Sequence, residues 1–160
     1  MLSWHEEKIN GVYVTRLKKN CDRRGILIET FRLDELPVKV NLAMSYVSYT
    51  KPGVSRGPHE HLKQSDIFSF IGPGNFLLKL WDNRENSETY GTFVGLYLGQ
   101  EIPSTVFIPP GVVHGYKNSS TELGMVINYP DKLYKGWGRK DEVDEIRHEV
   151  IEDSAYCMED

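Results

Sequence analysis

Short apolar runs interrupted at close intervals constrain this chain more than any other feature. The runs alternate with period two, are rich in β-branched and aromatic residues, and are separated about every eight to twelve residues by Gly, Pro and Asn. Such spacing predicts an all-β sandwich or jelly roll. Near the carboxyl end, Val143, Ile146 and Val150 at i, i+3 and i+7 predict one short amphipathic helix. We expect strands at 11–17, 25–32, 43–50, 66–71, 75–82, 91–98, 104–108, 114–118 and 123–129.

Length and composition indicate one globular domain. The 160 residues, 39% hydrophobic and 26% charged, can bury a core and exclude disorder. We expect amino-terminal strands in 1–50, a barrel core in 51–130 and a tail in 131–160. No apolar run reaches the roughly 18 residues of a membrane span, and the first residues lack a secretory signal, so we expect a cytoplasmic protein. A net charge of −4 argues against a nucleic-acid partner.

Two clusters of polar residues stand out along the chain. His59 and His61 follow a turn at 51–53, and a strand through both would point the two rings the same way. His114 follows the rigid Pro-Pro-Gly turn at 109–111. Two histidines on one face are either metal ligands or an acid/base pair with its helper, and the residues alone leave both interpretations open.

The two clusters resemble the two sequence motifs of the cupin family. The resemblance implies a double-stranded β-helix, which is a jelly roll, with the substrate pocket inside the mouth of the barrel. In the first motif an aspartate stands here where a glutamate is usual. The first motif is matched by Gly53, His59, His61 and Asp66, and the second by Pro109, Gly111, His114 and Asn118.

A narrower resemblance covers roughly residues 22–146 and is to the dTDP-4-dehydrorhamnose 3,5-epimerase family. Residues 22–25 and 29–31 look like the D-x-R-G and E-T-F opening of that family. Residues 51–59 are similar to its K-x-G-V-L-R-G-L-H signature, and residues 107–115 to its F-I-P-P-G-x-x-H-G. The resemblance implies an isomerase of the nucleotide-sugar epimerase type, active in deoxysugar or cell-surface polysaccharide biosynthesis.

The resemblance also implies a mechanism without a cofactor. A histidine removes the proton next to the 4-ketone of a nucleotide-activated sugar, and a tyrosine on the opposite face returns one. Carried over, His59 is the base, Asp141 holds its tautomer, Tyr129 is the acid and His114 stabilises the enolate. The residues that would bind the substrate are Arg24, Glu29, Arg56 and His61.

Several positions depart from the family pattern. His61 stands where the family has a glutamine, and the lysine that stabilises the enolate falls at about Asp66. The acid tyrosine of the family falls two residues before Tyr129, which would face the same side. The Q-x-N pair that contacts the nucleotide base in the family falls at about Met44 and Tyr46. A different nucleotide or a different sugar therefore stays open.

These departures support two alternatives. His59, His61, Asp66 and His114 together fit a three-histidine, one-carboxylate site for a divalent metal, which would make the protein a metal-dependent cupin enzyme. The other alternative is a cupin that binds sugar without catalysis.

Family resemblance further implies a homodimer whose subunits exchange their amino-terminal strands. The exchange would carry Arg24 and Glu29 into the pocket of the partner. The expected ligand is a nucleotide-diphosphate sugar, since an arginine fork suits phosphate oxygens.

Overall fold

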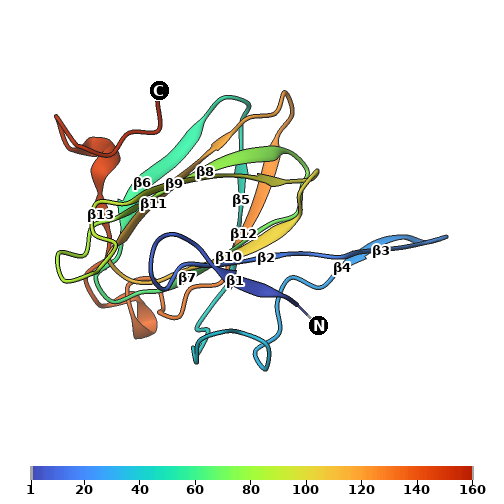
Figure 1. Cartoon of the computed structure of the whole chain (residues 1–160), viewed down its shortest axis with the longest axis horizontal. Coiled ribbons are helices and arrows are strands. Elements are labelled where there is room, and N and C mark those ends of the chain that lie inside the picture. Colours follow the sequence, from blue (N-terminus) through green and yellow to red (C-terminus); the bar gives the residue numbers. More distant parts are fainter. Residues whose placement is uncertain (1, 160) are drawn as a thin grey trace.

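In the computed structural model, which describes residues 2–159, the regular secondary structure consists almost entirely of antiparallel strands. Two sheets face each other, and a two-stranded hairpin projects beyond them (Figure 1). The larger sheet has the order β1 (Trp4–Glu6), β2 (Tyr13–Arg16), β10 (Ser104–Ile108), β7 (Asp66–Phe70), β12 (Gly124–Asn128) and β5 (Tyr46–Thr50). The second has the order β13 (Ile146–Arg147), β6 (Ser55–Glu60), β11 (Val112–Asn118), β8 (Asn75–Asp82) and β9 (Phe93–Gly99), and the hairpin consists of β3 (Lys19–Asp22) and β4 (Gly25–Ile28).

The core lies between the two sheets and is largely aromatic. Phe70 and Phe76 are fully buried and lie with their ring centroids 5.6 Å apart. Tyr116 from β11 packs edge-on against both rings. Each such ring contributes about 1.5–3 kcal/mol by leaving water, so this cluster is a main source of stability.

The core becomes polar at one end because of strand alternation. On β7, Phe70, Phe68 and Asp66 share a face, since side chains two residues apart point the same way. On β11, Tyr116 and His114 do likewise, and the His114 ring lies 5.6 Å from that of Phe68. Both strands therefore carry an apolar anchor deep in the core and a titratable side chain at the same end.

The all-β prediction is confirmed, and the expected helix in the tail is wrong. Strands predicted at 75–82 and 104–108 match β8 and β10, whereas β1, β3, β6 and β13 lie outside the predicted ranges. Instead of a helix, Ile146–Arg147 pairs with the edge of β6, and His148–Val150 forms a single 3-10 turn, η2. A lone short helix is marginal in water, whereas the edge of β6 offers backbone groups that need partners.

Only short turns of helix occur in the tail. Besides η2, the tail contains one other 3-10 turn, η1 (Trp137–Arg139), and within residues 2–159 no helix is long and apolar enough to cross a membrane.

Candidate active site

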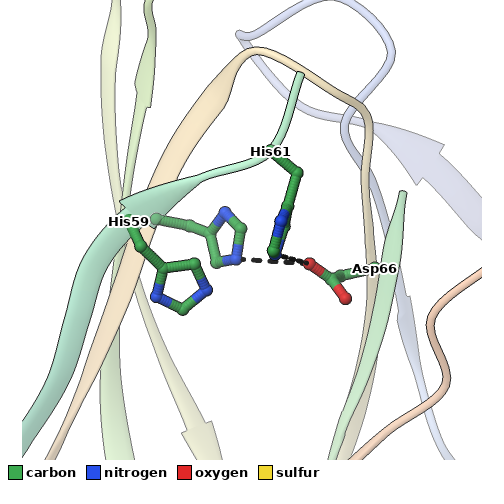
Figure 2. A group of neighbouring side chains, drawn as sticks. His59, His61 and Asp66 are labelled. Atoms are coloured by element: carbon green, nitrogen blue, oxygen red, sulfur yellow. Dashed lines mark ion pairs between the residues drawn. The ribbon is translucent and has the colours of Figure 1, made fainter. Parts of the chain in front are cut away.

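Three histidines and one aspartate meet at the polar end of the core. His59 on β6 lies directly opposite His114 on β11, and the two ring centroids are 4.5 Å apart. His61 follows the end of β6, and Asp66 begins β7 in the facing sheet, so both sheets contribute (Figure 2). Gly57 lets β6 approach β11 here, because a Cβ at this position would lie 2.7 Å from the His114 carbonyl oxygen. The predicted convergence of the two motifs is thus observed.

Asp66 is the centre of this group. Its side chain is 1% exposed, and its Oδ2 lies 3.3 Å from Nε2 of His61 and 3.5 Å from Nε2 of His114. Asn128 Nδ2 donates to Oδ1 at 2.8 Å, and Gln64 Nε2 does so at 3.1 Å. Burial acts to raise the pKa of Asp66, but the hydrogen bonds from His61 and Asn128 outweigh it and lower the pKa to about 2. The group is therefore a carboxylate.

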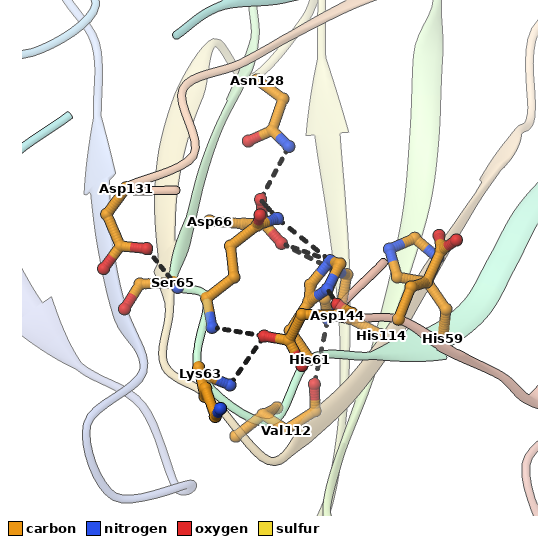
Figure 3. A network of polar contacts seen from close by, with 12 residues as sticks. His59, His61, Lys63, Ser65, Asp66, Val112, His114, Asn128, Asp131 and Asp144 are labelled. Carbon is orange, nitrogen blue, oxygen red and sulfur yellow. Dashed lines mark hydrogen bonds and ion pairs between the residues drawn. The ribbon is translucent and has the colours of Figure 1, made fainter. Parts of the chain in front are cut away.

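Backbone carbonyls fix the orientation of two of the imidazoles. Nδ1 of His114 lies 2.9 Å from the carbonyl oxygen of Val112, and Nδ1 of His61 contacts that of Asp144 (Figure 3). Carbonyls only accept, so both Nδ1 atoms carry a proton and both Nε2 atoms point at Asp66. Burial lowers the pKa of His114, which keeps this ring neutral with a lone pair on Nε2. Burial acts to lower the pKa of His61, but the hydrogen bond to Asp66 outweighs it and raises the pKa.

His59 is the most exposed of the three rings, with 16% of its side chain accessible. Burial is the main cause that lowers the pKa of His59, to about 2, so the ring is neutral. Its Nδ1 lies 4.0 Å from Oε1 of Glu145, and Arg147 holds that carboxylate through Oε2 at 2.7 Å. An imidazole beside a carboxylate is the arrangement expected of a general base.

Similarity to known proteins agrees with this geometry. The model of the family "dTDP-4-dehydrorhamnose 3,5-epimerase" matches residues 6–140. The chain belongs to this family. A probable low-salt glycan biosynthesis epimerase, Agl13, of Haloferax volcanii is 38% identical over 127 residues, which cover 79% of this chain and 81% of the relative. The spore coat polysaccharide biosynthesis protein SpsL of Bacillus subtilis is 38% identical over 68% of this chain and 71% of its own length.

Solved structures of the epimerase family share the fold. The dTDP-4-dehydrorhamnose 3,5-epimerase from Sulfolobus tokodaii has a TM-score of 0.72 at 26% identity, covering 91% of this chain and 81% of that one. The Legionella pneumophila epimerase in complex with dTDP-4-keto-L-rhamnose has a TM-score of 0.78 at 22% identity, covering 92% and 77%. The predicted cupin-type jelly roll, the family and the isomerase class are therefore confirmed.

The structure does not bring Asp141, the expected partner of the base, to His59. Asp141 is exposed, its backbone N–H donates to the Lys135 carbonyl at 2.9 Å, and its side chain packs over Gly136. Glu145, four residues later, is the carboxylate beside His59. The pairing of β13 with β6 places it there, and that pairing has no signal in the local sequence.

Tyr129 also lies apart from the histidines in this chain. Val126 and Asn128 on β12 point inward, so the following residue points to the other face of the sheet. The Tyr129 ring packs on Phe31 at 4.8 Å, and its hydroxyl lies 3.3 Å from Oγ1 of Thr30.

A different tyrosine, Tyr46 on β5, reaches the site. It pairs across the sheet with Asn128, whose Nδ2 donates to its hydroxyl at 2.8 Å and also to Asp66. Burial raises the pKa of Tyr46 to about 12, which keeps the hydroxyl protonated. The ring itself is 43% exposed, so it faces both the site and solvent.

The predicted substrate-binding arginines occupy two separate places. Arg56 lies on β6, three residues before His59, and donates from Nε to Thr50 Oγ1 and from Nη2 to the Tyr49 carbonyl, both at 2.9 Å. Arg24 lies at the turn of the projecting hairpin and pairs with Asp22 at 2.6 Å. The hairpin that carries Arg24 projects beyond the two sheets, on the side opposite to β13 (Figure 1).

Glu29 follows the hairpin directly and lies 3.9 Å from Arg32. It therefore stays with Arg24 in the amino-terminal segment and lies outside the histidine group.

The same group of side chains is able to hold a metal ion. Within residues 2–159, His59, His61, Asp66 and His114 each offer one donor atom, and these atoms all lie within 4.8 Å of one another. The sequence-based metal alternative named the same four residues.

Proposed function

We propose that this protein epimerises a nucleotide-activated 4-keto sugar by proton transfer next to the ketone. The observation that carries the proposal is His59, a neutral and partly exposed imidazole with a carboxylate on one side and the buried histidine–aspartate group on the other. A base of this kind breaks the C–H bond by taking the proton, while the electron pair moves onto the ketone oxygen as an enolate.

Glu145 orients the base in this proposal. It faces Nδ1 of His59, which directs Nε2 toward the substrate and stabilises the imidazolium formed when the proton arrives. Glu145 thus takes the role that the sequence assigned to Asp141.

We assign the return of the proton to Tyr46 in place of Tyr129. Its hydroxyl is protonated and is tied to Asp66 through Asn128, so its position is fixed relative to the base. A proton delivered to the face opposite His59 would invert the carbon centre.

The diphosphate of the substrate would bind Arg56. Two of its N–H groups are used within the chain, which fixes the guanidinium and leaves donors for phosphate oxygens. A homodimer would add Arg24 and Glu29 from the hairpin of the partner. The exposed Ile26 and Leu27 on that hairpin support such a contact.

The biological setting we propose is cell-surface glycan biosynthesis in the cytoplasm. Relatives with 38% identity are named for glycan and spore coat polysaccharide biosynthesis. Cys21 and Cys157 are both exposed free thiols, which suits a reducing compartment.

Solvent deuterium incorporation tests the proposed reaction. The protein is incubated in D2O with a panel of nucleotide-activated 4-keto sugars, and NMR follows the C3 and C5 positions. We expect exchange at C3, C5 or both, abolished in His59→Asn and retained in His148→Asn, whose imidazole lies outside the site. Binding of the donors without exchange at any position would overturn the epimerase and support a sugar-binding cupin.

A further inference from the structure

We propose that His61, Asp66 and His114 form a binding site for one divalent transition-metal ion, with His59 left free at its rim as the base. A divalent metal is the alternative cofactor that the sequence indicated with four ligands, and the proposed site assigns it three. Figures 2 and 3 show the side chains converging from β6, β7 and β11.

The distances between the donor atoms already suit a metal. Asp66 Oδ2 lies 3.3 Å from His61 Nε2 and 3.5 Å from His114 Nε2. Two ligands on a tetrahedral ion with bonds of about 2.1 Å are about 3.4 Å apart. Each aspartate–histidine pair therefore already has the separation of two ligands on one ion, and the donor atoms of the whole group lie within 4.8 Å of one another.

A buried nitrogen without a hydrogen bond is the independent observation that points to a cation. His114 is 2% exposed, and its Nε2 makes no hydrogen bond among the described residues 2–159. Its Nδ1 lies 2.9 Å from the Val112 carbonyl, and its Nε2 points at the Asp66 carboxylate, 3.5 Å away. A buried nitrogen left without a hydrogen bond is costly, and a cation bound to both this atom and the carboxylate would satisfy the two.

A proton shared between His61 and Asp66 explains less of the geometry than a metal. A proton on Nε2 of His61 would satisfy that ring and the carboxylate, and the Gln64 amide, 3.1 Å from the same nitrogen, is a second source of a hydrogen bond. Neither the shared proton nor the Gln64 amide gives Nε2 of His114 a partner. A metal satisfies all three donors and displaces the His61 proton, as metal binding commonly does.

Each proposed ligand is also held from behind, as is typical of metal sites. His114 and His61 donate to the carbonyls of Val112 and Asp144. Asn128 and Gln64 donate to the second oxygen of Asp66. The loop that positions His61 is fixed in turn, because the Asp144 carboxylate accepts from the backbone N–H groups of residues 62–64.

The donor set restricts the identity of the ion. Two imidazole nitrogens with one carboxylate oxygen favour Zn²⁺, Fe²⁺, Co²⁺, Ni²⁺ or Mn²⁺ over the hard cations Mg²⁺ and Ca²⁺.

The role of the ion rests on the proposed epimerisation, although its binding does not. His114 donates from Nδ1 to the Val112 carbonyl and points Nε2 at Asp66, so neither nitrogen is free to donate to an enolate oxygen, which argues against the role the sequence assigned to it. An ion on the same side chain would polarise the ketone oxygen and stabilise the enolate beside His59. Since His59 is the most exposed of the three rings, it stays available to the substrate.

Cobalt titration of the metal-free full chain tests the site. The protein is stripped with a chelator, dialysed and titrated with Co²⁺ by calorimetry, while visible absorption reports the ligand geometry. We expect one ion per chain with nitrogen–oxygen d–d bands. Asn128→Ala, which removes a bond behind Asp66, should weaken binding by about 10–100-fold, and Asp66→Asn and His114→Asn by more. His59→Asn and the control His148→Asn should bind as the unaltered protein does.

Thermal unfolding keeps the result interpretable if a variant folds poorly. At a Co²⁺ concentration of 100 times Kd, the Tm of the unaltered protein should rise by about 5–10 °C, whereas Asp66→Asn should not respond. No binding, or binding that survives Asp66→Asn, would overturn the site. An equal loss in His59→Asn would make His59 a ligand and overturn the three-ligand assignment.

The metal and the epimerase proposals fail separately in these experiments. Deuterium exchange that persists in chelator with no Co²⁺ binding sinks the metal site and leaves the epimerase standing. One-to-one Co²⁺ binding without exchange for any donor does the reverse.

Discussion

Strand β6 places a histidine–carboxylate group on each of its faces, and the two groups differ in how fully their buried polar atoms are hydrogen-bonded. On the inner face lie His59 and the buried Asp66 group. On the outer face, Glu60 accepts from His148 at 2.9 Å and from Asn83 at 2.8 Å. Both carboxylates are almost fully buried, at 1% and 4% exposure. In the outer group Tyr156 completes the set by donating to Asn83 at 2.7 Å, whereas the inner group leaves Nε2 of His114 without a partner.

The difference separates a structural network from a functional one. Every bond of the outer group is made within the chain, and it ties the tail to β6. The side chains of the inner group are rigidly held, but not all of their buried polar atoms have a hydrogen-bond partner, which is typical of residues that bind a ligand or substrate. The outer group, and the candidate residues that lie apart from the histidines, therefore serve as controls for the inner group.

The largest expected effect is that of His59→Asn. Loss of a general base typically lowers turnover by about 10²–10⁴-fold, and we expect this fall in kcat with nucleotide affinity unchanged. Steady-state rates and calorimetric binding of the nucleotide diphosphate measure the two quantities. The control is His148→Asn, which removes an imidazole of similar burial from the outer group. Equal activity in the two variants would mean that His59 is not the base.

Tyr46→Phe should separate proton removal from proton return. The variant keeps the ring and loses the hydroxyl, so we expect kcat for inversion to fall by about 10²-fold while His59 still exchanges deuterium into the substrate. NMR distinguishes exchange with retention from exchange with inversion. Tyr129→Phe, whose hydroxyl contacts Thr30, should behave as the unaltered protein. The opposite ranking would restore the acid expected from the sequence.

His59 and His114 could be predicted because two motifs fix them locally. Each follows a Pro-Gly turn and opens or ends a strand, so alternation alone sets the direction of the side chain. The two strands that carry them then pair in the register that the jelly roll requires. The fold class followed from the same short-range signals.

Glu145 and Tyr46 could not be predicted because long-range pairing places them. Glu145 lies beyond residue 140, where the family match ends, and reaches His59 only because β13 adds to the edge of β6. Tyr46 is tied to Asn128, 82 residues away, through the pairing of β5 with β12. Tyr129 was predicted by its spacing from His114 in the family pattern. A shift of one residue along a strand moves a side chain to the other face of the sheet, so spacing alone does not place it.

Glu145→Gln should lower kcat less than the loss of the base itself. Oε1 of Glu145 lies 4.0 Å from Nδ1 of His59, which is longer than a hydrogen bond, and an ion pair of this length contributes about 1 kcal/mol, which corresponds to a fall of about 5-fold. We expect the fall in kcat with little change in KM, because Glu145 acts through His59 and not on the nucleotide. Asp141→Asn is the matched control and should retain full activity. A loss in Asp141→Asn with a fully active Glu145→Gln would restore the carboxylate named from the sequence.

The smallest expected effect concerns stability, and it tests the comparison of the two faces directly. In chelator, Glu60→Gln should lower the free energy of unfolding by about 1–3 kcal/mol, because a complete set of hydrogen bonds to a buried charge is weakened. Asp66→Asn should leave it unchanged or raise it, because an amide can donate to the lone pair of His114 that the carboxylate opposes. Urea unfolding with equal m-values measures both. Buried polar groups that are left unpaired for function lower the free energy of unfolding of the folded protein. A larger loss in Asp66→Asn than in Glu60→Gln would instead make the inner group a structural network like the outer one.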